Sequence, residues 1–350
     1  MSLEQNITLD RKTIFRMLIP VLIDQLFITL LPIVNTVVVS ALGQSSMSGV
    51  SIVNQLLFVY NLCLFGGTGG AGIFGAQFFG RGDYNGVRHT LRFNILLCAG
   101  APEDWERTLS TAHEWGLGAM LGIHPLWLDS TTPAELVGLR ELAASLLDDP
   151  HFIGLGEVGL DGFEPGLDQH KAEQVFLEEL KIARDLDLPL SIHVRRTASK
   201  TLGLLRRVYG SPGKTGFQPV RGAVHAFNGS DAEREAFLAF GLVLGFGGAC
   251  TYDGSKRIRR HLSELADGAW VLETDAPDMP PSSRRDAFAL GHSTLDTRPA
   301  DILEAARTAA QLRGTTLAAA AASARAAAIA AFPRLETLLR LPESFGRQTE

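Results

Sequence analysis

The sequence predicts an α/β fold with parallel strands over most of the chain, preceded by two membrane-spanning helices. Residues 25–80 contain no Asp, Glu, Lys or Arg, which is typical of membrane segments. After residue 100, short apolar runs alternate with helical stretches at offsets of about 25 to 40 residues, which is the rhythm of strand–helix–strand units. We therefore predict a membrane segment over 1–93 and an α/β unit over 94–350.

The membrane segment fits two helices, at about 15–42 and 50–79, each longer than the roughly 20 residues that cross a bilayer. Basic residues flank both outer ends and the short turn between the helices has none, so both ends are expected in the cytoplasm. Polar residues at membrane depth, such as Asp24 and Asn54, leave two interpretations open. The helices are either an anchor joined by polar contacts or part of a transport path.

Net charge distinguishes the first 100 residues from the rest of the chain, and the cysteines indicate the cellular setting. The chain has a formal charge of −6, and its first 100 residues hold six basic and four acidic side chains, so the remainder has a net charge of −8. This acidity argues against nucleic-acid binding by bulk charge, although a basic cleft remains compatible with it. Three scattered cysteines form neither a disulfide framework nor a thiolate metal site, so a reducing, cytosolic setting is expected for 94–350.

Seven apolar runs predict the strands of the α/β unit. Between them, segments such as 172–186 predict helices, because Val175, Phe176 and Ile182 recur at helical spacing. The (β/α)8 barrel, or TIM barrel, is the architecture of this kind that fits about 250 residues. The predicted strands are 95–98, 119–123, 152–156, 190–192, 223–224, 243–246 and 270–274.

Four potential metal ligands follow predicted strands: Glu157, His193, His225 and Asp275. Residues at the carboxyl ends of barrel strands meet over one mouth, so the fold would bring them together. Two imidazoles and two carboxylates suit Zn²⁺, Mn²⁺ or Mg²⁺, and such an ion supports hydrolysis by polarising a phosphoryl or acyl oxygen and activating water. Each residue alone also fits a structural role, such as capping a helix; the agreement of four strand ends favours a metal site.

The local motifs around these residues resemble the TatD family of metal-dependent deoxyribonucleases over about 94–335. The order and spacing of the motifs match as well. The motifs are Gly-Ile-His-Pro at 122–125, Gly-Glu-Val-Gly-Leu-Asp at 156–161, His-Val-Arg-Arg-Thr at 193–197, Val-His-Ala-Phe-Asn-Gly-Ser at 224–230 and Glu-Thr-Asp-Ala-Pro-Asp-Met-Pro at 273–280.

This resemblance implies a barrel of the amidohydrolase type, one or two divalent metal ions, and hydrolysis of phosphodiester bonds in DNA. It implies that Glu157 bridges the metal ions, that His193 and His225 hold the second ion, and that Asp275 binds the first and helps to activate water. Arg195 and His124 are the expected substrate-binding residues.

Arg196 and the basic run at 256–260 each allow two interpretations. Arg196 either faces substrate phosphate beside Arg195 or is simply solvated. Lys256, Arg257, Arg259 and Arg260 form either a local basic patch or a solvated helix face.

The chain departs from the TatD pattern in its first strand. Members of that family begin with a strand ending in Asp-x-His-x-His, whose histidines complete the first metal site, and no His-x-His occurs in this sequence. An Asn expected about five residues before Phe332 is replaced by Ala327. The predicted fold is therefore an incomplete (β/α)8 barrel that lacks its first strand.

Residues 16–93 resemble the opening of a multidrug and toxic compound extrusion (MATE) transporter, covering only its first two helices. The two resemblances meet between 88 and 101 without a linker, which indicates a chimeric chain. Residues 94–100 fit either a third membrane helix or a barrel strand.

The predicted function is that of a TatD-type hydrolase that is impaired by the lost ligands. The alternatives are a fragment of a MATE-type multidrug or cation antiporter with a passenger domain, and an inactive chimeric chain. The expected partners are DNA or another phosphodiester and, through the helices, the inner or plasma membrane. The hydrolase part is expected in the cytoplasm.

Overall fold

The computed structural model describes residues 96–128, 131–291 and 294–339, and all of them fall within one compact unit of the chain. The membrane helices predicted at 15–42 and 50–79 lie outside the described residues. Among the residues that the structure does describe, no helix combines the length and apolarity needed to cross a membrane.

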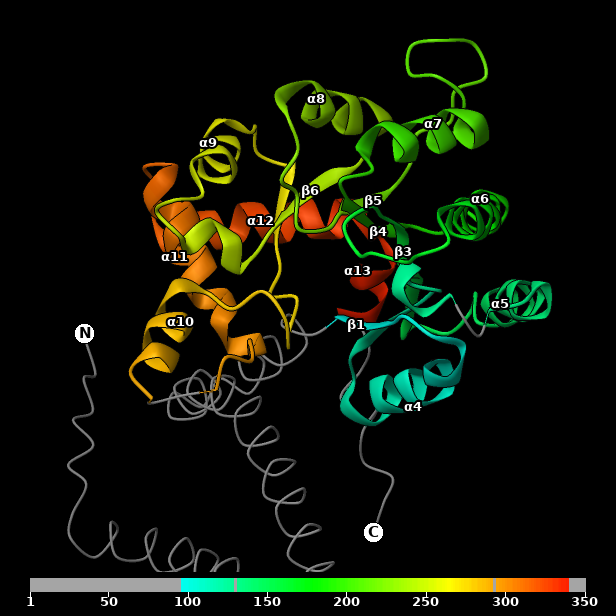
Figure 1. Ribbon diagram of the computed structural model, residues 1–350, viewed down its shortest axis with the longest axis horizontal. Helices are drawn as coiled ribbons and strands as arrows, with labels where there is room; N and C mark the ends of the chain where they lie inside the picture. The colour runs from blue at the N-terminus through cyan, green and yellow to red at the C-terminus, as the bar shows by residue number, and fades with distance from the viewer. Residues whose placement is uncertain (1–95, 129–130, 292–293, 340–350) are drawn as a thin grey trace, which may run out of the picture. The chain divides into compact units, whose positions relative to one another are not determined.

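A seven-stranded parallel sheet forms the centre of the unit, and its strands follow one another in chain order (Figure 1). All seven predicted strands are present. Residues 96–99 pair in parallel with the next strand, so this segment is a strand and not a third membrane helix. The strands are β1 (Leu96–Ala99), β2 (Gly118–Leu121), β3 (Phe152–Asp161), β4 (Leu190–Arg195), β5 (Gly222–Val224), β6 (Val243–Phe246) and β7 (Trp270–Leu272).

The sheet does not close into a full barrel within the described ranges. There, β1 and β7 stand at the two ends of the strand order, and no strand pairs with the outer edge of either. Closure of a barrel requires the first and last strands to hydrogen bond. The prediction of an incomplete parallel barrel is confirmed.

Helices follow the strands and cover the outer face of the sheet, as Figure 1 shows for α4 to α8. The predicted helix 172–186 is α6, which begins after Asp168, whose side chain accepts the amide hydrogens of residues 170 and 171. It buries Val175, Phe176 and Leu180 in the core, each contributing roughly 1.5–3 kcal/mol. The described α-helices are α4 (Trp105–Trp115), α5 (Pro133–Ser145), α6 (Gln169–Asp185), α7 (Ala198–Tyr209), α8 (Asp231–Phe240), α9 (Lys256–Glu264), α10 (Ser282–Ala289), α11 (Ile302–Leu312), α12 (Leu317–Ala331) and α13 (Arg334–Leu339).

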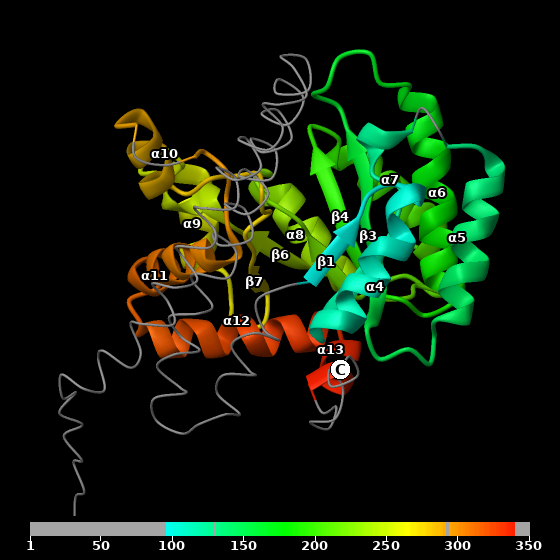
Figure 2. The same ribbon diagram turned by 90° about the horizontal axis from the view of Figure 1, so that it is seen from below.

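Two C-terminal helices, α12 and α13, cross the amino-terminal ends of the strands (Figure 2). Ala327 and Phe332 pack there against Met120 and Ile153 from the inner face of the sheet. The alanine found in place of the expected Asn is thus a core residue. The candidate site lies at the opposite end of the sheet, where the strands finish.

A register shift between β3 and β4 sets the direction in which the side chains of β3 point. Leu155 pairs with Leu190 and Val158 with Ile192, so three residues of β3 span two of β4. This bulge lets Leu155 and Val158 both face the outer core. Pairing continues to Asp161 because Gly159 (φ 141°) has no side chain; a Cβ there would lie 2.1 Å from the carbonyl oxygen of His193.

Candidate metal centre

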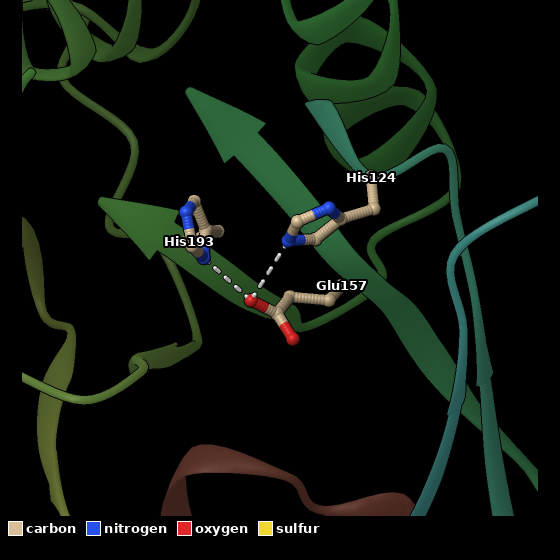
Figure 3. A group of neighbouring side chains, drawn as sticks. All are labelled: His124, Glu157 and His193. Atoms are coloured by element: carbon tan, nitrogen blue, oxygen red, sulfur yellow. Dashed lines mark hydrogen bonds and ion pairs between the residues drawn. The ribbon is translucent and has the colours of Figure 1, made fainter. Parts of the chain in front are cut away.

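Glu157 stands at the centre of the candidate site. Its Oε1 atom lies 2.8 Å from Nδ1 of His193, 3.4 Å from Nε2 of His124 and 3.9 Å from Nε2 of His225. Figure 3 shows the first two imidazoles pointing at this oxygen from neighbouring elements. Three rings, one within β4 and two that follow β2 and β5, therefore converge on one carboxylate.

Two of the predicted ligands do not lie beyond strand ends, contrary to the prediction. Glu157 lies within β3, which runs to Asp161, and His193 lies within β4, which runs to Arg195. The pairing of β3 with β4 extends past both residues, which the apolar pattern alone does not reveal. His225 directly follows β5 and Asp275 lies three residues after β7, as predicted.

A buried carboxylate orients His193 from behind. Asp161 is fully buried and its Oδ2 lies 3.0 Å from Nε2 of His193. If Nε2 donates to this carboxylate, the lone pair of Nδ1 faces Glu157, where a metal ion would be held. Burial opposes the charge of Asp161, but the amide hydrogens of Glu164 and Phe163 and the His193 ring lower its pKa, so the orienting group is ionised.

His225 has an equivalent arrangement. Its Nδ1 lies 3.1 Å from Oε2 of Glu273, while its Nε2 lies 3.3 Å from Oδ1 of Asp275. The other oxygen of Glu273 accepts the amide hydrogen of Ala226 at 2.6 Å, which fixes the carboxylate. In the neutral ring, the lone pair of Nε2 is thereby directed toward Asp275 and Glu157.

The sequence pattern predicts no role for Asp161 and Glu273, although both lie inside the motifs at 156–161 and 273–280. The signal that could have found them is the strand period of two. Asp161 lies four residues after Glu157, and Glu273 lies two residues before Asp275. Within β3 this spacing puts Asp161 on the same face as Glu157, and both contact the ring of His193. Glu273 and Asp275 lie beyond the end of β7, and both contact the ring of His225.

The donor atoms form two groups that share Glu157. One group is His124, Glu157 and His193, and the other is Glu157, His225 and Asp275; within each group the donor atoms lie within 4.8 Å of one another. The resemblance implied a different pairing, with His193 and His225 on one ion. The rings of these two histidines are 6.5 Å apart between centroids.

His124 differs from the other two rings in its hydrogen bonding. Its Nδ1 accepts the amide hydrogen of Leu126 at 3.2 Å, so a neutral ring carries its hydrogen on Nε2, which faces Glu157. A nitrogen that carries hydrogen is a donor and not a metal ligand. The geometry therefore suits His124 for hydrogen bonding to substrate better than for holding an ion.

Negative charge accumulates in this buried site. Burial by itself would raise the pKa of Glu157, but His225, His124 and His193 hold it well below the ordinary value. Burial likewise opposes the charge of His225, yet Glu273, Glu157 and Asp275 raise its pKa well above the usual range. Carboxylates that keep a proton on a buried imidazole would stabilise a divalent cation in the same place, so the donor set fits a metal ion.

The site opens into a cavity of about 1510 Å³. Arg195 and Arg196 line it together with Arg257, whose guanidinium holds the side-chain and main-chain oxygens of Asn228. The rest of the predicted basic patch is a helix surface: Arg260 pairs with Asp231 at 2.8 Å, and Arg259 donates to the carbonyl of Cys250. One residue of the four therefore lines the cavity.

Comparisons with known proteins identify the family of the chain. The family model described as TatD related DNase matches residues 77–333, and the model described as MatE matches residues 20–101. The uncharacterized metal-dependent hydrolase YjjV of Escherichia coli K12 is 34% identical over 188 residues, which cover 53% of this chain and 68% of that protein.

Further relatives include a 3'-5' ssDNA/RNA exonuclease TatD of Klebsiella pneumoniae, 29% identical over 53% of this chain and 67% of that protein. The crystal structure of YjjV, a TatD homolog from Escherichia coli K12, superposes with a TM-score of 0.60 at 28% identity, covering 68% of this chain and 86% of that chain. Because the TatD related DNase model spans more than half of the sequence, the chain belongs to this family and is a hydrolase of the metal-dependent type.

Proposed function

We propose that this chain hydrolyses phosphodiester bonds in DNA or a related nucleic acid with the help of one or two divalent ions, Zn²⁺, Mn²⁺ or Mg²⁺. The observation that carries the proposal is that Glu157 is shared by two groups of donor atoms at the floor of one cavity. A relative named as a 3'-5' ssDNA/RNA exonuclease supports the choice of substrate.

In this proposal Glu157, His193, His225 and Asp275 hold the metal. A bound divalent ion supplies polarisation of a phosphoryl oxygen and a lowered pKa of water. Asp275 accepts the proton of the attacking water on a carboxylate oxygen, because it lies at the open side of the site with a side chain 27% exposed.

The substrate phosphate is held by two groups at the cavity wall. Arg195, with a half-exposed side chain, offers guanidinium hydrogens to phosphate oxygens. His124 donates its Nε2 hydrogen to another oxygen of the same phosphate. The carboxylates Asp161 and Glu273 keep the rings of His193 and His225 in position.

We further propose that the hydrolase comprises residues 94–350 and that it is attached to a transporter-derived segment, 1–93, in a chimeric chain. The MatE match to 20–101 and the TatD match to 77–333 support this division. Without His-x-His, neither group of donor atoms has the two further imidazoles that the TatD resemblance implies, so activity is expected to be low. A transport function is not favoured, because the MatE match covers a small part of the chain.

The test is to titrate Zn²⁺ or Mn²⁺ into the detergent-solubilised full-length chain and to measure cleavage of short DNA. We expect saturable metal binding and slow cleavage that EDTA and His225→Ala abolish, and faster cleavage after the missing strand with its two histidines is restored. Absence of metal binding would refute the assignment of the centre. Binding without any cleavage, even with the strand restored, would refute the substrate. A peptide spanning residues 88–101, detected by mass spectrometry, tests whether the join exists in the protein.

A further inference from the structure

Phe163 is a large aromatic side chain left exposed at the wall of the cavity. It is 44% exposed and lines the same cavity as Glu157 and His193. The guanidinium carbon of Arg195 lies 3.8 Å from the centroid of its ring, and that of Arg196 lies 4.6 Å away. An exposed ring with two guanidinium groups stacked over it presents planar groups that carry positive charge.

The backbone holds this cluster rigidly next to the candidate metal centre. The amide hydrogens of Phe163 and Glu164 both bond to Oδ1 of Asp161, at 2.7 and 3.0 Å. The other oxygen of Asp161 contacts His193 at 3.0 Å. One buried carboxylate thus holds both the backbone of Phe163 and a candidate metal ligand, so the fold sets the distance between these two residues.

The two arginines reach one ring because the chain leaves the extended conformation between them. Consecutive residues of a strand point to opposite faces. Arg196 has a left-handed backbone (φ 60°), which is uncommon for a residue other than glycine. This conformation breaks the alternation and directs both side chains to Phe163.

We propose that Phe163, Arg195 and Arg196 form a stacking platform for the nucleobase next to the cleaved phosphate of a single-stranded nucleic acid. The inference rests on the proposed function and deepens it by naming the residues that bind the base. Planar guanidinium and aromatic surfaces stack bases of any sequence. The bases of a duplex already stack on one another, so a platform inside a cavity favours an unpaired strand. Arg195 also lies 3.7 Å from Asp161, which anchors it while half of its side chain stays exposed.

The experiment uses a single-stranded oligonucleotide with 2-aminopurine beside its terminal phosphodiester, because stacking quenches the fluorescence of this base. Binding to the full-length chain is measured in EDTA, where no cleavage occurs. Phe163→Leu should weaken binding about 10-fold or more and abolish the quenching, whereas Phe163→Tyr should preserve both. Phe288→Leu is the matched control, since Phe288 is 53% exposed and lies outside the residues lining the cavity.

A second substrate is the same oligonucleotide with an abasic residue in place of the 2-aminopurine, so that no base lies beside the terminal phosphodiester. Its affinity, measured by competition, should be the same for Phe163→Leu and for the parent chain, because no base is left to stack. Unchanged binding and quenching in Phe163→Leu would overturn the platform. If the parent chain binds and quenches the oligonucleotide but cleaves neither substrate, the platform stands and the proposed hydrolysis fails.

Discussion

Replacing Glu273 by Gln tests whether the carboxylate behind His225 tunes the metal centre. Glu273 makes two contacts, to Nδ1 of His225 at 3.1 Å and to the amide of Ala226 at 2.6 Å. The amide oxygen of Gln can replace one of these acceptors, so the variant removes the negative charge while retaining the shape of the side chain. Loss of such an outer partner typically lowers metal affinity 10–100-fold, which corresponds to about 1.4–2.7 kcal/mol.

The assay is calorimetric titration of Zn²⁺ into the metal-free full-length chain at pH 7. The matched control is Glu235→Gln, because the Glu235 side chain is 74% exposed and is not among the residues lining the cavity. It removes the same charge and should leave affinity unchanged. If Glu273→Gln binds Zn²⁺ as tightly as the parent chain, then Glu273 does not orient His225, and the argument that His225 offers Nε2 to the ion is refuted.

Three further outcomes follow from the described contacts. Glu179 is fully buried and accepts the amide hydrogen of Ile123 at 2.8 Å, and burial raises its pKa well above the ordinary value. A raised pKa gives stability that is present below about pH 4.5 and is lost as the pH rises. The free energy of unfolding of Glu179→Gln, measured in urea, should therefore gain up to about 1.4 kcal/mol per pH unit over that of the parent chain as the pH rises. A difference between the two chains that is independent of pH would contradict this. Arg334→Met should destabilise the fold by about 2–4 kcal/mol in urea unfolding, because Arg334 donates to the carbonyls of residues 147, 149 and 152, whereas the exposed Arg207→Met should have little effect. Saturating Zn²⁺ at 100 times its Kd should raise stability by about 2.7 kcal/mol and EDTA should reverse this; a melting temperature insensitive to both would argue against a folded-state metal site.

Much of the fold was predictable from the sequence because parallel strands in this architecture are buried on both faces and read as short apolar runs. The run 243–246 coincides with β6, and the helix predicted at 172–186 is α6 with its start three residues earlier. The end of β3 was missed by five residues, since its last residues are Val-Gly-Leu-Asp and Gly159 is normally a strand breaker. Only the close approach of β4 explains why glycine continues the strand there.

The candidate site was predictable in its residues but not in its contacts. His124, His193, His225, Glu157 and Asp275 come together as expected from strand order. The assignment of each ring nitrogen was not predictable, because it depends on which side chain lies behind the ring. That in turn depends on the bulge between Leu155 and Val158, which shifts the register of β3 relative to β4.

The sequence by itself determined the parallel α/β class, the types of potential ligand, the acidic balance of 94–350 and the absence of a His-x-His pair, since these are properties of local pattern and covalent composition. The tertiary structure decided what spacing cannot encode: that Glu157 is shared by two donor groups, that Asp161 orients His193, and that Phe163 lies against two guanidinium groups. The reason is that local pattern reports how a segment folds, whereas these contacts join segments whose relative position depends on strand register, a bulge and one left-handed residue.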